Sequence, residues 1–192
     1  MDDGNLASLV IVLVLVGMAA FFAIAETALS SVSKNRVKIA ADRGDTRAKN
    51  TLFALDNFDR AITTLLICTN IVHISAATIV TVAVTRIWGL SAVSISTIIT
   101  TIIIFFAGEM LPKSIAKKNS MKFALATSGI LKFFMIVFRP LAALLTKIGQ
   151  MAADLTGAEP EVTVTEDELV DIIEDMEEEG SIDEDQSNLL QA

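Results

Sequence analysis

Three long uncharged segments dominate the pattern of apolar and polar positions along the chain. A helix needs about 20 apolar residues to cross the hydrocarbon core of a bilayer, and each segment is long enough. The segments cover residues 4–25, 61–85 and 87–108. We therefore predict an all-α membrane protein with three transmembrane helices, over about residues 5–32, 60–86 and 90–111.

Basic residues follow the first and the third of these segments. A stretch rich in Lys and Arg runs from Lys34 to Lys49, and residues 113–118 hold three lysines. Because such loops stay in the cytoplasm, we expect the N-terminus outside and the C-terminus inside, in the plasma membrane. Residues 34–56 then form interfacial helices. The first apolar run follows two aspartates rather than basic residues, so we interpret it as a retained helix and not as a signal peptide.

Another apolar stretch covers residues 120–148, within a helix that we predict over 118–149, and Lys132 and Arg139 divide it into short uncharged pieces. A basic residue near the bilayer centre costs about 2.5–3.5 kcal/mol on insertion scales. A fourth span would also carry the acidic C-terminal segment to the outside. We therefore predict a belt helix that lies at the cytoplasmic interface and bends at Pro140.

The charge balance divides the chain into two parts. All 15 basic residues lie within residues 1–150, whereas residues 151–192 are strongly acidic and contain no Lys or Arg. We predict a transmembrane domain over 1–150 and a cytoplasmic linker over 151–192, where two capping boxes indicate a small bundle of acidic helices. The acidic segment argues against a nucleic-acid partner. The single cysteine, Cys68, excludes an intrachain disulfide.

A carboxylate and a proline close the third segment, in the sequence GEMLPK over residues 108–113. Pro112 has no N–H, so in an α-helix it leaves the carbonyl of Gly108 without its partner and breaks the helix. A free carbonyl beside Glu109 supplies two hard oxygen ligands, which Mg²⁺, Ca²⁺ and Na⁺ prefer. The alternative is a helix that ends at the interface, with Glu109 in water or paired with Lys113.

Polar residues also lie in the first two segments. Asn70 in the second segment needs a partner, either another helix or an ion, and Ser75 lies near it. Glu26, with Ser30 one turn later, either pairs with a basic residue or draws cations towards a pocket. The chain contains no zinc-protease, nucleophile-elbow or phosphate-loop motif, so we do not expect an enzyme.

These motifs together resemble the CorC and cyclin M family of magnesium transporters. The resemblance rests on FFAIAETA at residues 21–28, on Asn70, on GEMLPK, and on EEGSIDEDQSNLL at residues 178–190. It implies a homodimer of three-span protomers in membrane lipid, with an inward-facing acidic cavity and Mg²⁺ efflux driven by Na⁺. In the full-length protein, paired CBS modules are expected to follow the acidic linker.

The resemblance also implies which residues bind the cation. Asn70, the carbonyl of Gly108 and Glu109 would be ligands, and the family usually has serine where this chain has Ala23 and often where it has Ala25. Ala23 can contribute only a backbone oxygen. Two other readings stay open: a membrane-anchored sensor that binds divalent cations without moving them, and a structural anchor for a C-terminal module.

Overall fold

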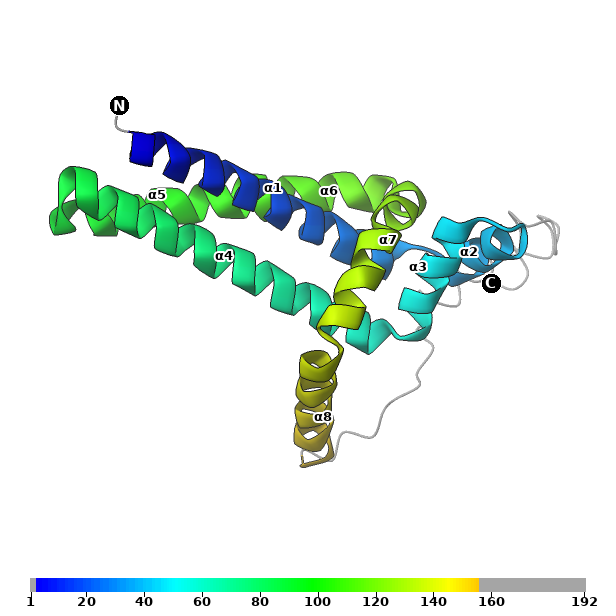
Figure 1. Cartoon of the computed structure of the whole chain (residues 1–192). Coiled ribbons are helices and arrows are strands. Elements are labelled where there is room, and N and C mark those ends of the chain that lie inside the picture. Colours follow the sequence, from blue (N-terminus) through cyan, green and yellow to red (C-terminus); the bar gives the residue numbers. More distant parts are fainter. Residues whose placement is uncertain (1–2, 156–192) are drawn as a thin grey trace, which may run out of the picture. The chain divides into compact units, whose positions relative to one another are not determined.

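The computed structural model describes residues 3–155, and every regular element among them is helical (Figure 1). The chain divides into two compact units, Met1–Gly149 and Gln150–Ala192. The acidic helices predicted within 151–192 lie almost entirely outside the described residues. The elements are α1 (Asp3–Ser31), α2 (Lys34–Asp42), α3 (Thr46–Asp56), α4 (Phe58–Trp88), a 3₁₀ turn η1 (Leu90–Ala92), α5 (Val93–Phe105), a π-helical turn η2 (Phe106–Met110), α6 (Leu111–Lys118), α7 (Ser120–Val137) and α8 (Arg139–Leu155).

Three long helical rods lie side by side in the first unit: α1, α4, and the continuous rod formed by α5, η2 and α6 (Figure 1). A tight turn at Gly89 joins α4 to α5. Gly89 has φ +81°, a left-handed conformation that glycine adopts without steric cost. Since α4 and α5 are consecutive and antiparallel, a cation site can draw on both walls of this hairpin and on α1.

Small side chains allow α1 and α4 to pack closely. The shared core contains Ala19, Phe22, Ala25 and Leu29 of α1 together with Ala61, Leu65, Cys68 and Val72 of α4. Without a hydrophobic driving force between helices inside a bilayer, such close backbone approach supplies much of the association energy. The rod formed by α5, η2 and α6 is packed less closely, because no residue in its most apolar 18-residue stretch is buried.

Four described helical segments are long and apolar enough to cross a membrane. They are Leu6–Ser31, Phe58–Trp88, Leu90–Lys118 and Ser120–Val137. The first three correspond to the predicted spans, and the fourth is α7. Figure 1 shows α7 crossing α1 and α4 at a steep angle rather than running along them. The described residues thus form a helical structure with four helices that are long and apolar enough to span a membrane, and the count of three spans stays a prediction.

Lys132 of α7 has a partner outside the long rods. Lys132 Nζ donates a 2.8 Å hydrogen bond to Asn50 Oδ1 of α3 and lies 5.4 Å from the centroid of the Phe53 ring. The belt helix predicted over 118–149 is two helices in the structure. They meet at Phe138, two residues before Pro140, because proline fits the first turn of α8 but not a helix interior.

Candidate functional site

The rod that carries Glu109 does not break at Pro112, contrary to the sequence-based prediction. The chain stays helical from Val93 to Lys118, and the residues before Pro112 form the π-helical turn η2. The N–H of Leu111 donates to the carbonyl of Phe106, five residues earlier. The π-helical turn holds one residue more than an α-helical turn. Pro112 therefore lies in the first turn of α6, where a missing N–H is tolerated. Single π-helical turns inside α-helices occur frequently at functional sites.

Gly108 brings this wide turn into close contact with α1. A Cβ atom at Gly108 would lie 3.3 Å from Cβ of Ala19 and 3.9 Å from the carbonyl oxygen of Val16. The glycine is buried, and its backbone faces α1 with no side chain between them. The π turn therefore sits directly against the first long helix.

Replacement of Gly108 by valine is expected to destabilise the packing of η2 against α1. Overpacking a close contact costs about 1–3 kcal/mol, so the variant should unfold several degrees lower in a detergent thermal melt. Gly17→Val is the matched control, because a Cβ at Gly17 on α1 would meet nothing within 4 Å. Equal melting temperatures for the two variants would contradict the close approach.

An ion-paired cluster links α1 to the π turn and α6. Lys113 Nζ lies 3.0 Å from Glu109 Oε1, one helical turn earlier, and 3.5 Å from Glu26 Oε2 of α1. The side chains of Lys113, Glu109 and Glu26 are 33%, 32% and 25% exposed. In such a half-buried setting, charges interact more strongly than they do in bulk water. Two carboxylates share one ammonium, so the cluster carries a net charge of about −1 when all three groups are ionised.

Ala23 lies on the same face of α1 as the residues that contact the site. Ala19, Ala23 and Glu26 are spaced by four and three residues, which places them along one side of a helix. Ala19 faces Gly108 and Glu26 pairs with Lys113, so Ala23 lies between these two contacts. Its side chain is 1% exposed. Ala25 is equally buried but belongs to the core between α1 and α4.

Asn70, Ser30 and Ser75 are not joined to the ion-paired cluster through their side chains. Asn70 is exposed on α4, and its amide group donates a 2.9 Å hydrogen bond to the carbonyl of Leu66. The amide oxygen keeps its capacity as an acceptor or ligand. Ser30 Oγ donates to the backbone carbonyl of Glu26 at 2.9 Å, and Ser75 is half-buried on α4.

Two polar residues of α4, Thr69 and His73, each have a buried side-chain atom without a hydrogen-bond partner. Within the described part of the chain, Thr69 Oγ1 and His73 Nε2 are the buried side-chain atoms without a hydrogen-bond partner. An unsatisfied buried polar group costs about 1–3 kcal/mol. The sequence placed both residues in the second span, but only the packing of the neighbouring helices shows that these atoms are enclosed.

The cluster offers hard oxygen ligands rather than a closed metal cage. Over residues 3–155, no three His, Cys, Asp or Glu side chains gather closely enough to hold a metal ion. Mg²⁺ normally keeps several waters and binds through one or two carboxylates. Glu109 and Glu26 supply such carboxylates, and Lys113 occupies the position beside them. A cation that binds Glu109 must therefore compete with the ammonium of Lys113.

Comparison with known proteins places this chain in a family. Residues 10–186 match the model of the cyclin M transmembrane N-terminal domain. A chloroplastic DUF21 domain-containing protein of Arabidopsis thaliana is 30% identical over 185 residues, which cover 94% of this chain and 28% of the relative.

Two bacterial proteins show the same level of similarity. A UPF0053 protein of Haemophilus influenzae is 30% identical over 82% of this chain and 38% of its own length. The UPF0053 inner membrane protein YfjD of Escherichia coli is 30% identical over 77% of this chain and 35% of its own length. The chain thus spans well under half of each of these relatives. The family resemblance in the sequence is confirmed: this multi-pass membrane protein belongs to the cyclin M family and contains its transmembrane N-terminal domain.

Proposed function

We propose that this chain is the membrane part of a Mg²⁺ transporter that exports Mg²⁺ from the cytoplasm in exchange for Na⁺. The observation that carries the proposal is the half-buried pair of carboxylates, Glu109 and Glu26, held beside a π-helical turn where the uncharged runs 4–25 and 87–108 end. Ionisable groups inside apolar spans are costly and usually mark an ion path. Family membership supports the same class of activity.

In this proposal Glu109 is the charged ligand of the cation. The carbonyl of Gly108 and the amide oxygen of Asn70 add neutral oxygens, and Ala23 offers at most its backbone carbonyl. Waters fill the remaining positions, as expected for an ion that gives up its hydration reluctantly. Asn70 would reach the cation from the opposite wall of the hairpin, which requires α4 and η2 to close around the ion.

Lys113 makes the site reversible. Without a cation, its ammonium lies 3.0 Å from Glu109 and 3.5 Å from Glu26 and neutralises part of their charge. An arriving Mg²⁺ displaces the ammonium from Glu109, and the returning ammonium helps to expel the ion. Because the Lys113 ammonium and Mg²⁺ compete for Glu109, the affinity of the site for Mg²⁺ stays low enough for release.

The proposed setting is a plasma-membrane homodimer with the N-terminus outside and the C-terminus in the cytoplasm. The basic residues around α2, α3 and α6 support this orientation, because Lys and Arg accumulate in cytoplasmic segments. The hydrogen bond from Lys132 to Asn50 supports the placement of α7 on that side as an interfacial helix. CBS modules that follow the acidic segment in the full-length protein would regulate transport.

Ion flux in liposomes that contain only this protein tests the proposal. We expect Mg²⁺ to leave Mg²⁺-loaded vesicles when an opposing Na⁺ gradient is applied, at a rate well above that of empty vesicles. A fluorescent Mg²⁺ indicator outside the vesicles gives the rate. Binding of Mg²⁺ without any flux would contradict transport and favour the alternative function, a membrane-anchored sensor of divalent cations.

A further inference from the structure

A small cavity that is lined partly by hydroxyl groups lies between α4 and α5, outside the ion-paired cluster. It has a volume of about 50 Å³. A water molecule needs about 10–15 Å³ of such space, so the cavity has room for a few waters. Its lining is rich in hydroxyl groups, although both helices are otherwise mainly apolar. The lining residues are Ala77, Val80 and Thr81 of α4 and Thr97, Thr100, Thr101 and Ile104 of α5.

Two residues of α4 with buried atoms that lack a hydrogen-bond partner precede this cavity along the helix. Thr69, His73, Ala77 and Thr81 follow each other at intervals of four residues, so they form one row along α4. Ala77 and Thr81 line the cavity, and Thr69 and His73 continue the row towards Asn70. The row leads from the level of Asn70 to the cavity, with the apolar Ala77 between His73 and Thr81.

The hydroxyl groups in the cavity can bind water. Thr81 and Thr97 donate to the carbonyls of Ala77 and Val93 at 2.8 and 2.9 Å, and their oxygens keep lone pairs for further hydrogen bonds. Inside a bilayer a polar atom finds no solvent unless the protein supplies a wet cavity. On α4 the lining begins at Ala77 and does not include Thr69 or His73, so waters in the cavity would bind the threonine hydroxyls.

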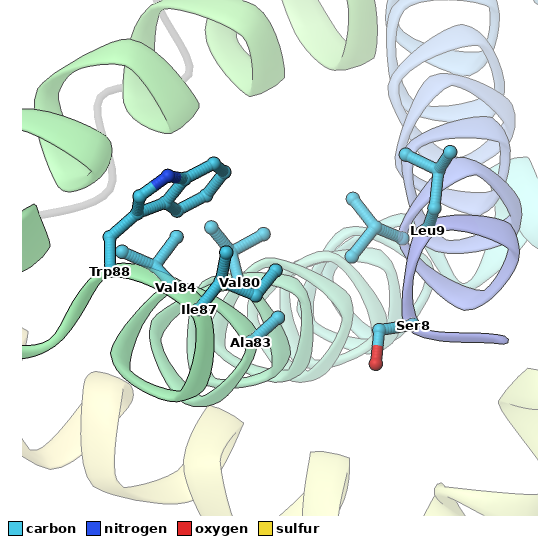
Figure 2. A pocket seen from close by; sticks show the side chains of 8 residues that line it. Ser8, Leu9, Val80, Ala83, Val84, Ile87 and Trp88 are labelled. Atoms are coloured by element: carbon cyan, nitrogen blue, oxygen red, sulfur yellow. The ribbon is translucent and has the colours of Figure 1, made fainter. Parts of the chain in front are cut away.

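A larger cavity nearby has the opposite character. It has a volume of about 180 Å³ and lies between α1 and α4, and Figure 2 shows its apolar side chains and the ring of Trp88. Ser8 supplies the single hydroxyl group of its lining. A cavity lined in this way stays dry or takes up lipid, and it offers no path for a hydrated ion. Val80 lines both cavities.

We propose that the cavity between α4 and α5 is filled with water and forms the outer part of the cation route. The hydroxyl groups of Thr81, Thr97, Thr100 and Thr101 bind this water and replace lost hydration waters of the passing ion. Hydroxyl and water oxygens suit a partly hydrated Mg²⁺. The route rests on the proposed function, whereas the presence of water in the cavity does not.

Water-edited solid-state NMR on the 192-residue chain in bilayers tests for the water. Side-chain signals of Thr81 and Thr100 are expected to receive polarisation from water at short mixing times. Thr78 is the matched control, because it lies on α4 outside the cavity lining and is exposed on the helix surface. Transfer to Thr81 and Thr100 no faster than to Thr78 would show a dry cavity and overturn the proposal.

Flux measurements with Thr100→Val test the route. Valine keeps the shape of threonine but removes the hydroxyl group, so Mg²⁺ flux should fall about fivefold while Mg²⁺ binding stays unchanged. Thr78→Val should leave both unchanged. Unchanged flux in Thr100→Val would overturn the route even if the cavity is wet. If the wild-type protein shows no flux, the route falls with the proposed function, and the NMR result still decides whether the cavity holds water.

Discussion

Glu109→Gln is expected to abolish Mg²⁺ flux while the protein stays folded. Glutamine keeps the size of the side chain but removes the charge that attracts the dication. Even partners outside the first coordination shell of a metal contribute about 10–100-fold in affinity, so loss of the charged ligand should lower flux by at least about 100-fold. Lys113 keeps its 3.5 Å pair with Glu26, so the contact between α1 and α6 survives.

The control for this variant is another carboxylate on the same chain. Asp42→Asn removes an exposed carboxylate at the end of α2 and should transport at the wild-type rate. Thermal melting and size-exclusion chromatography establish that both variants fold. Wild-type flux in Glu109→Gln would show that the cation path does not pass the π-helical turn.

Lys113→Met is expected to strengthen Mg²⁺ binding and slow its release. Removal of the ammonium leaves Glu26 and Glu109 facing each other without a counter-charge, and the two carboxylates then favour a dication between them. We expect the dissociation constant for Mg²⁺ to fall by about tenfold, which corresponds to about 1.4 kcal/mol. Flux should fall at saturating Mg²⁺, because the tethered cation no longer helps to expel the ion.

Lys113→Arg separates the role of the charge from that of the side-chain length. Arginine keeps the positive charge at this position, so its Mg²⁺ affinity should stay within a few-fold of the wild type. Both affinities can be measured by titration of the purified variants. If Lys113→Met binds Mg²⁺ as weakly as the wild type, or more weakly, the ammonium does not compete for the site.

The sequence predicts the helical rods well, because their uncharged runs must be long enough to cross a bilayer. It also identifies Gly108 and Glu109 as neighbours on the third rod, since they adjoin along the chain. It does not predict the π-helical turn, because Pro112 can be accommodated either by a break or by a widened turn. The choice depends on how closely Gly108 packs against Ala19, which is 89 positions away.

The ion-pair partner of Glu26 also cannot be predicted from the sequence pattern alone. The pattern indicates that this carboxylate needs a cation or a basic side chain, but Lys113 lies 87 residues away. The same holds for Thr69 and His73, whose buried atoms depend on the surrounding helices. For α7, apolar length favours a span, whereas the charge of Lys132 and its bond to Asn50 favour the interface.

The most direct test of the central claim is a calorimetric titration of Mg²⁺ into the purified wild-type protein, Glu109→Gln and Asp42→Asn. The account predicts saturable binding to the wild type and to Asp42→Asn, and loss of that binding in Glu109→Gln. Equal binding to all three proteins would contradict the account, because it would place the Mg²⁺ site away from the π-helical turn.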